Sequence, residues 1–272
     1  MTSKAYAQVI GDPIEQSLSP TIHGFWLEAL GIDASYGRRQ VTRAELPAYL
    51  NDRTDDESWR GSNVTMPLKL DAVALADEAT DRAVAAGAAN VLMRRDGRLV
   101  AANTDVGAIA LLLARLYESK ARMGSVTLLG NGGAARAALV ALKLVGISAV
   151  RIQARDLAEA MKLAVEFGLE AEPATFTAPI GSDGLINATP LGMPGRDCLN
   201  CDLHRMPPSG WVFDMVTEPA ATPLIEAAKA QGLKTVDGID MLVEQAATSF
   251  KLFFDADAPR DRDAQLWQRL KR

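Results

Sequence analysis

Three features of the sequence predict an α/β protein with two domains. Segments typical of strands and helices alternate along most of the chain, which is the pattern of a parallel sheet covered by helices. A glycine-rich turn, GNGGAARA, follows an apolar strand and opens a helix near the middle of the chain. The 272 residues are enough for one large or two medium-sized domains.

We expect the N-terminal domain to begin with a strand over residues 5–11 and a helix over 20–31. Ser19 is the expected N-cap of that helix, because Pro20 suits the first helical position. The elements that follow are expected to be a strand over 35–41, a short helix over 44–52 and a strand over 60–65.

The stretch SNVTMPLK, residues 62–69, is expected to place a lysine at the start of a helix. Thr65 is the expected N-cap, Pro67 lies at the start of the helix, and the helix is expected to continue to residue 79. Lys69 would then lie in the first turn of this helix and face the end of the sheet where its strands meet the following loops. Taken alone, a lysine is more often a solvated surface charge.

A β-hairpin is expected over ANVLMRRDGRLVAANTD, because Asp96-Gly97 is a strong type I′ turn signal. The hairpin would bring Asn90 and the segment Asn103–Asp105 to the same end of the sheet. Asp105 is therefore the candidate partner of Lys69.

Lys69 and Asp105 have the chemistry of an acid–base pair. A partly desolvated lysine near a carboxylate can move a proton to or from a substrate hydroxyl. Histidine is scarce, with only His23 and His204, so other residue types must do such work. Short uncharged polar side chains accompany the pair and suit a polyhydroxylated or carboxylated small molecule: Ser17, Ser19, Asn63, Thr65, Asn90 and Asn103. Turn and cap chemistry explains the two serines equally well.

The second domain is expected after a connecting helix over residues 106–118. Its alternating elements predict a parallel, doubly wound sheet. The strands are expected over 125–130, 149–154, 184–190, 211–216 and 234–238, and the helices over 135–146, 157–168 and 223–232. The last helices, from about Ile239 to Arg272, have no strand partner, so we expect them to pack on the first domain.

The turn at Gly130-x-Gly132-x-x-Ala135 matches the dinucleotide-binding pattern G-x-G-x-x-G/A, with a strand before it and a helix after it. Its glycines permit close approach of the backbone to a pyrophosphate, which the helix N-terminus stabilises. Coenzyme choice is expected to be set after the next strand. An acid there favours NAD and an arginine favours NADP. Arg155 and Asp156 are adjacent, which leaves both open.

Composition excludes several classes of partner. The net charge of −5 argues against nucleic-acid binding. No apolar run approaches the ~18 residues of a membrane span. The N-terminus, MTSKAYAQVIGDP, lacks the apolar region of a signal peptide, so we expect a cytoplasmic protein.

Cys198, Cys201 and His204 are spaced like metal ligands or a redox pair. A fourth ligand and a second C-x-x-C motif are missing, and prolines and glycines flank the stretch. A variable loop with incidental thiols is the simpler interpretation, and no metal site is expected.

Seven motifs occur in one order: GDPIEQSLSPTIH, NVTMPLK, GAANV, NTDVG, GNGGAARA, INATPLGM and DGIDMLVEQAA. Together they resemble the shikimate dehydrogenase family, which includes quinate/shikimate dehydrogenases. The resemblance covers residues 8 to about 254. It implies a discontinuous substrate-binding domain, 1–105 with 239–272, around an NAD(P)-binding Rossmann domain, 106–238, with the active site in the cleft between them.

The resemblance also implies roles for individual residues. Lys69 and Asp105 would grip the reacting hydroxyl while a hydride passes to the nicotinamide. Substrate contacts are implied for Ser17, Ser19, Asn63, Thr65, Asn90, Thr217 and Gln245. Coenzyme contacts are implied for Gly130, Asn131, Gly132, Gly133, Ala134, Arg155, Asp156, Thr189, Met215 and Gly238.

The implied reaction is the reversible, NADPH-dependent reduction of 3-dehydroshikimate to shikimate, in aromatic amino-acid (chorismate) biosynthesis. The expected partner is thus a small-molecule substrate, and the protein is expected to be a monomer or homodimer. Two positions depart from the family pattern. Thr217 stands where a tyrosine is usual, and Ala154-Arg155-Asp156 stands where Asn-Arg-Thr is usual. A paralogue acting on quinate or a related acid with NAD, and a non-catalytic nucleotide or metabolite sensor, are the alternatives.

Overall fold

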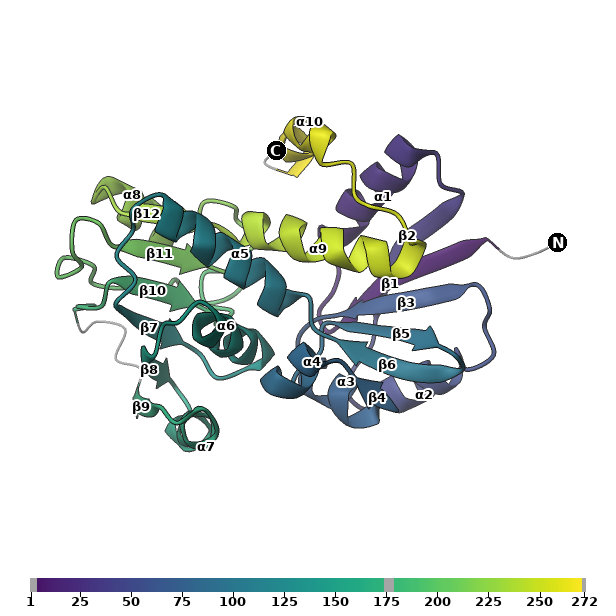
Figure 1. Cartoon of the computed structure of the whole chain (residues 1–272), viewed down its shortest axis with the longest axis horizontal. Coiled ribbons are helices and arrows are strands. Elements are labelled where there is room, and N and C mark those ends of the chain that lie inside the picture. The colour runs from purple at the N-terminus through teal and green to yellow at the C-terminus, as the bar shows by residue number, and fades with distance from the viewer. Residues whose placement is uncertain (1–3, 174–178, 271–272) are drawn as a thin grey trace. The chain divides into compact units, whose positions relative to one another are not determined.

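The structure, a computed structural model, describes residues 4–173 and 179–270 (Figure 1). The chain divides into two compact units. Unit 1 comprises Met1–Thr104 and Val243–Arg272, and unit 2 comprises Asp105–Leu242. Each unit contains its own six-stranded sheet.

Unit 1 is built on a mixed sheet with the strand order β2-β1-β3-β5-β6-β4. The strands β1, β2 and β3 run parallel, whereas β5 is antiparallel to both β3 and β6. Their bounds are β1 Ala5–Gly11, β2 Ala34–Gln40, β3 Trp59–Val64, β4 Glu78–Ala79, β5 Val91–Arg95 and β6 Arg98–Ala102.

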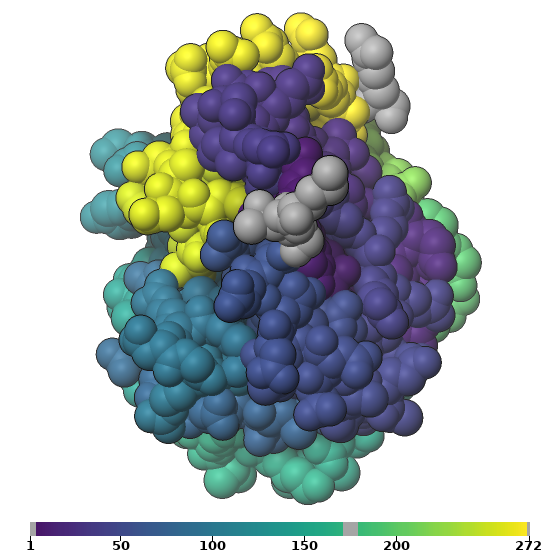
Figure 2. Space-filling model, turned by 90° about the vertical axis from the view of Figure 1, so that its right-hand side faces the viewer, coloured from purple at the N-terminus to yellow at the C-terminus, as the bar shows by residue number. Residues whose placement is uncertain are grey.

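Helices cover both faces of this sheet, with α2, α3 and α4 on one face and α1 and α9 on the other (Figure 1). Their bounds are α1 Ser19–Leu30, α2 Leu46–Asn51, α3 Lys69–Leu75, α4 Asp81–Ala86 and α9 Gly238–Phe254, followed by the short 3-10 helix η1 Arg260–Arg262 and by α10 Asp263–Leu270. The C-terminal residues lie against the N-terminal helix (Figure 2), where the Arg269 guanidinium lies 4.7 Å from the centre of the Phe25 ring.

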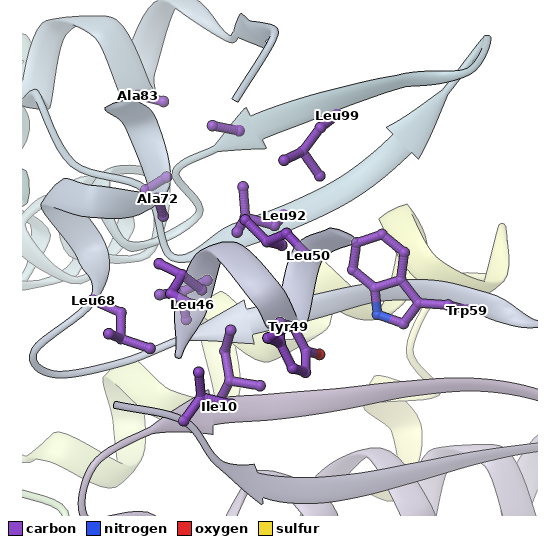
Figure 3. Close-up of a cluster of buried hydrophobic side chains, with 14 residues drawn as sticks. Ile10, Leu46, Tyr49, Leu50, Trp59, Leu68, Ala72, Ala83, Leu92 and Leu99 are labelled. Carbon is purple, nitrogen blue, oxygen red and sulfur yellow. The ribbon is translucent and has the colours of Figure 1, made fainter. Parts of the chain in front are cut away.

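The first face buries an aliphatic core. Leu46 and Leu50 of α2, together with Leu68, meet Ile10 and Leu92 of the strands (Figure 3). The opposite face buries an aromatic cluster from α1, β2 and α9. Side chains alternate between the two faces along a strand. In β3, Ser62 therefore bonds to Tyr49 of α2, whereas Asn63 bonds to Ser249 of α9.

The expected helix over residues 67–79 is wrong in its second half. α3 ends at Leu75, and Glu78–Ala79 form β4, which pairs with β6. The reason is a contact distant in sequence: the Asp77 carboxylate accepts from the Leu99 amide at 2.7 Å, which diverts the chain toward the sheet.

The two expected N-caps are also wrong. Leu18 caps α1 and Leu68 caps α3, and neither helix has a side-chain cap hydrogen bond. Ser19 and Thr65 lie instead at or just before the first turn. Lys69 does begin α3, as expected.

The expected hairpin is confirmed. Arg95 pairs with Arg98 across the turn, and both turn residues have positive φ, 50° for Asp96 and 77° for Gly97. These are the angles that a type I′ turn requires.

Unit 2 is the expected doubly wound domain. Its sheet is fully parallel, with the order β12-β11-β10-β7-β8-β9. The strands are β7 Ser125–Leu129, β8 Ala149–Ala154, β9 Glu170–Pro173, β10 Gly184–Asn187, β11 Trp211–Asp214 and β12 Lys234–Val236. The helices are α5 Asp105–Glu118, α6 Gly133–Leu144, α7 Leu157–Phe167 and α8 Pro223–Ala230. This is the Rossmann order, in which ligands bind where the winding reverses, here between β7 and β10.

Within the ranges 4–173 and 179–270, no helix combines the length and the hydropathy that crossing a membrane would need.

Candidate active site

Two loops of unit 1 meet at the carboxyl ends of β1 and β3. A Cβ on Gly11 would lie 2.4 Å from Cγ2 of Thr65 and 2.7 Å from the Met66 carbonyl, so only glycine permits this approach. After β1, the Ser19 amide donates to the Ser17 hydroxyl at 3.4 Å. The structure thus brings the predicted serines together and seats Thr65 beside the strand that precedes them.

A chain of buried amides continues from this point. Nδ2 of Asn63 donates to the Asn90 carbonyl at 3.2 Å. Asn90 bonds twice to Thr104: its Nδ2 donates to the Thr104 hydroxyl at 2.8 Å, and its Oδ1 accepts from the Thr104 amide at 2.7 Å. Nδ2 of Asn90 also donates to Oε1 of Gln245 at 3.2 Å. Three of the predicted substrate residues are therefore linked in one network.

Lys69 and Asp105 each begin a helix beside this network. The Lys69 carbonyl accepts from the Ala89 amide at 2.8 Å, next to Asn90, and the lysine is half-buried. Asp105 follows Thr104 directly in the chain and is only 3% exposed. The half-buried Lys69 and the buried Asp105 are the two groups that the sequence predicts to transfer the proton.

An aromatic stack lies behind the serines. The Tyr36 hydroxyl donates to Oδ1 of Asn63 at 2.7 Å, and its ring stacks on His23 with centroids 3.9 Å apart. Burial raises the pKa of Tyr36, and a hydrogen bond from Ser19 opposes that rise. Burial lowers the pKa of His23 to about 3. His23 is therefore a neutral packing residue rather than an acid or base at neutral pH.

The glycine-rich turn of unit 2 meets the loop after β10. Gly130 has φ 106°, and its amide donates to the Gln153 carbonyl at 2.8 Å. A Cβ on Gly130 would lie 3.1 Å from the Ala188 carbonyl and 3.1 Å from Cγ2 of Thr189. Gly132 then caps α6 without a side-chain hydrogen bond, and the first backbone amides of such a helix are the groups that bind a pyrophosphate. These residues fit a dinucleotide at the switch point of the sheet.

Asn187 and Asp214 fix the loops that follow β10 and β11. Oδ1 of Asn187 accepts from the Thr189 hydroxyl at 2.6 Å, and its Nδ2 donates to the Asp214 carboxylate at 2.9 Å. The Asn187 carbonyl also accepts from the Met215 amide at 3.0 Å. Burial raises the pKa of Asp214, and a hydrogen bond from Thr222 opposes that rise. The predicted coenzyme residues Thr189 and Met215 are thus set by one shared network.

Gly238 completes this group within unit 2. A Cβ there would lie 2.2 Å from the Val216 carbonyl and 2.7 Å from the Met215 carbonyl. Thr217 lies two residues after Met215 and is half-buried. The structure places it in unit 2, on the loop that carries the predicted coenzyme residue Met215.

Arg155 and Asp156 follow β8, whose Gln153 carbonyl bonds to Gly130. Asp156 caps α7, and its carboxylate accepts from the Glu159 amide at 3.1 Å. The acid therefore has a structural role that is independent of the coenzyme. Arg155 is exposed.

Cys198 is exposed and Cys201 is half-buried, and both are free thiols. The His204 ring bonds to the Asp202 carboxylate. Across the described part of the chain, no cluster of histidine, cysteine and acidic residues could hold a metal ion.

Sequence reasoning missed four residues that the structure places in these networks: Tyr36, Asn187, Asp214 and Ser249. Asn187 and Asp214 did carry a signal, because each is a polar residue that ends an apolar strand at the switch-point edge. Ser249 carried a weaker one, four residues after Gln245 on the same helical face.

The order of the parallel sheet, with a G-x-G-x-x-A turn at its reversal point, defines unit 2 as a Rossmann-type domain. Two family models match the chain. One describes the shikimate dehydrogenase substrate-binding domain and matches residues 9–92; the other describes the shikimate 5′-dehydrogenase C-terminal domain and matches residues 238–265.

Relatives along the whole chain agree with these matches. The shikimate dehydrogenase (NADP(+)) of Sphingopyxis alaskensis is 44% identical over 263 residues, which cover 96% of this chain and 95% of that relative. The shikimate 5-dehydrogenase of Thermus thermophilus, solved with NADP(H) and shikimate, is 32% identical with a TM-score of 0.84, covering 98% of this chain and 99% of that one. The quinate dehydrogenase of Corynebacterium glutamicum, solved with NAD, is 27% identical with a TM-score of 0.84, covering 98% and 99%. The chain belongs to the shikimate dehydrogenase family.

Proposed function

We propose that the protein is a shikimate dehydrogenase that reversibly reduces 3-dehydroshikimate to shikimate with NADPH. The observation that carries the proposal is the buried amide network of unit 1. Asp105 directly follows Thr104 of this network in the chain, and the Lys69 carbonyl accepts from the amide of Ala89, the residue before Asn90. A small polyhydroxylated acid needs such a set of directed, uncharged hydrogen-bonding groups beside a proton carrier.

The proposed roles follow from the chemistry of each group. Lys69 and Asp105 hold the reacting oxygen and move its proton. Ser17 and Ser19 bind the substrate carboxylate, and the hydrogen bond from the Ser19 backbone amide to the Ser17 hydroxyl supports this pairing. Ring hydroxyls are assigned to Thr65, Asn90 and Gln245, and Asn63 and Thr217 are the remaining candidate substrate contacts. The nicotinamide, when bound, supplies or accepts the hydride.

We assign the substrate to residues 1–105 with 239–272 and the coenzyme to residues 106–238. The glycine-rich turn and the Asn187 network support the second assignment, because they gather Gly130, Thr189 and Met215 at the switch point of one sheet. Asn131, Gly132, Gly133 and Ala134 complete the pyrophosphate turn. A cytoplasmic location and a monomeric or dimeric state stay predictions.

NADP is the proposed coenzyme, and Arg155 is the residue proposed to read its 2′-phosphate. An acid at this position can indicate a hydrogen bond to the ribose of NAD. The Asp156 carboxylate instead accepts from the Glu159 amide as the cap of α7, so its presence is explained without NAD. We expect Arg155→Ala to raise KM for NADP about tenfold, the worth of one charge-assisted hydrogen bond, and to change KM for NAD less than about twofold. Steady-state kinetics with both coenzymes measure this. Arg151→Ala, which alters an exposed arginine of β8, the strand before Arg155, is the control. Equal losses with NADP and NAD would show that Arg155 does not read the phosphate.

Quinate with NAD is the second candidate, and Thr217 favours it, because a phenolic donor to the substrate carboxylate is missing at this position. A structural neighbour, the quinate dehydrogenase of C. glutamicum, was solved with NAD. A metabolite sensor, by contrast, would have no use for a lysine and carboxylate pair.

Initial rates with shikimate and quinate, each with NADP and NAD, test the proposal. We expect shikimate with NADP to give the highest kcat/KM. A higher value for quinate with NAD would favour the second candidate. Tight coenzyme binding without turnover of either acid would favour a sensor.

A further inference from the structure

Ser249 of α9 is completely buried in unit 1, and no role has yet been assigned to it. Its hydroxyl accepts from Nδ2 of Asn63 at 2.9 Å and donates to the Gln245 carbonyl at 3.0 Å. The Thr104 hydroxyl lies 3.2 Å away. This one hydroxyl therefore joins β3, the segment before α5, and α9.

Tyr36 bonds to the oxygen end of the Asn63 side-chain amide, whereas Ser249 bonds to the nitrogen end. Its hydroxyl donates to Oδ1 of Asn63, while Ser249 and the Asn90 carbonyl take the two N–H groups. An amide has one acceptor end and two donors. Turning the Asn63 amide over would place its nitrogen against the Tyr36 donor and its oxygen against the Asn90 carbonyl. The three partners thus select one orientation.

Hydrogen bonds connect the fixed Asn63 amide to the proposed substrate contacts. Thr104 shares the Ser249 hydroxyl and is bonded twice to Asn90, which in turn donates to Gln245. Without Ser249, Asn63 and Thr104 would each lose a partner in a buried network, where each unmade hydrogen bond is costly.

We propose that Ser249 and Tyr36 are positioning residues, which orient Asn63 and Thr104 so that Asn90 and Gln245 meet the substrate in a fixed geometry. The proposal rests on the proposed function. It predicts an effect on substrate affinity rather than on the chemical step. Neither residue carries the proton, and amides that are held less firmly bind the substrate more weakly.

The test is a double-mutant cycle with Ser249→Ala and Tyr36→Phe. Each variant removes one hydroxyl, and the second keeps the ring that stacks on His23. We expect each to raise KM for shikimate about five- to tenfold, the range for one neutral hydrogen bond, with kcat within about twofold. KM for NADP should not change. The double variant should lose less than the product of the single losses, because both act through Asn63.

Thr248→Ala is the matched control, since Thr248 is exposed and adjacent on the same helix. Wild-type KM for shikimate in both single variants would overturn the proposal, and so would fully multiplicative losses. Circular dichroism and NADPH binding check that each variant is folded. If wild-type protein neither turns over nor binds shikimate, the proposed function itself fails and the positioning roles fall with it. An active wild type with an unaffected Ser249→Ala variant rejects only the positioning roles.

Discussion

Lys69→Ala is expected to lower kcat for shikimate oxidation by about 10²–10⁴-fold, the usual contribution of a positioned acid–base group. Lys69 begins α3, and its carbonyl accepts from the amide of Ala89, so a backbone hydrogen bond fixes the start of the helix that carries it. Truncation should therefore remove the ammonium group and leave the fold in place. Steady-state rates with shikimate and NADP measure the loss.

Lys251→Ala is the control for this variant. Lys251 is also a lysine of unit 1 but is exposed and paired with Asp257, so its loss should leave turnover unchanged. Coenzyme binding should be intact in both variants. Unchanged turnover in Lys69→Ala would contradict the proposed mechanism, whatever the coenzyme preference proves to be.

A second large effect is expected on stability in acid, through His23. In the unfolded chain the imidazole has a pKa of about 6.5, whereas burial lowers the pKa of His23 to about 3 in the folded protein. The unfolded state therefore binds an extra proton between these values, so stability falls as the pH falls from 6.5 toward 3. The loss from this one group approaches about 1.4 kcal/mol per pH unit once the pH lies well below 6.5, and it amounts to roughly 2 kcal/mol between pH 6.5 and 4.5.

His23→Phe isolates this effect. The variant keeps an aromatic ring against Tyr36, and it removes two ring nitrogens that have no hydrogen-bond partner among the described residues. Urea unfolding at pH 6.5, 5.5 and 4.5 measures the slope; Trp26, whose ring centroid lies 5.7 Å from that of His23, is the fluorescent reporter. The slope of His23→Phe should be shallower than wild type by the amount above. Equal slopes in the wild type and His23→Phe would show that His23 does not cause the loss of stability in acid. His204→Ala, which alters an exposed histidine, is the control and should have the wild-type slope.

Local chemistry made much of the fold predictable. The hairpin was predictable because Asp96-Gly97 accepts positive φ at both positions, and the structure has it. The Rossmann-type unit was predictable because the strand, the glycine turn and the helix are contiguous in sequence. Lys69 was correctly placed at the start of a helix, although the predicted N-cap, Thr65, was wrong.

Contacts between distant segments were not predictable. The helix after Lys69 stops early because Asp77 bonds to Leu99, which local helix signals do not reveal. In the sequence alone, the acid Asp156 favoured NAD. In the structure it is the N-cap of α7, which local sequence did not reveal. Ser249 and Asn63 are 186 residues apart, so their hydrogen bond exists only after the fold brings α9 to β3. An amphipathic pattern predicts which face of a helix or strand such a residue occupies, but it does not predict which residue it will bond to.

The division of the chain has a consequence for its synthesis. Unit 1 consists of two stretches separated by the whole of unit 2, which is contiguous. Domains tend to fold as they leave the ribosome, in order from the N-terminus. Residues 1–104 must therefore wait until α9 emerges, since Trp26 packs on Phe250 and Asn63 bonds to Ser249. The nascent chain is expected to carry a folded unit 2 while the apolar face of its first sheet is still open to chaperones.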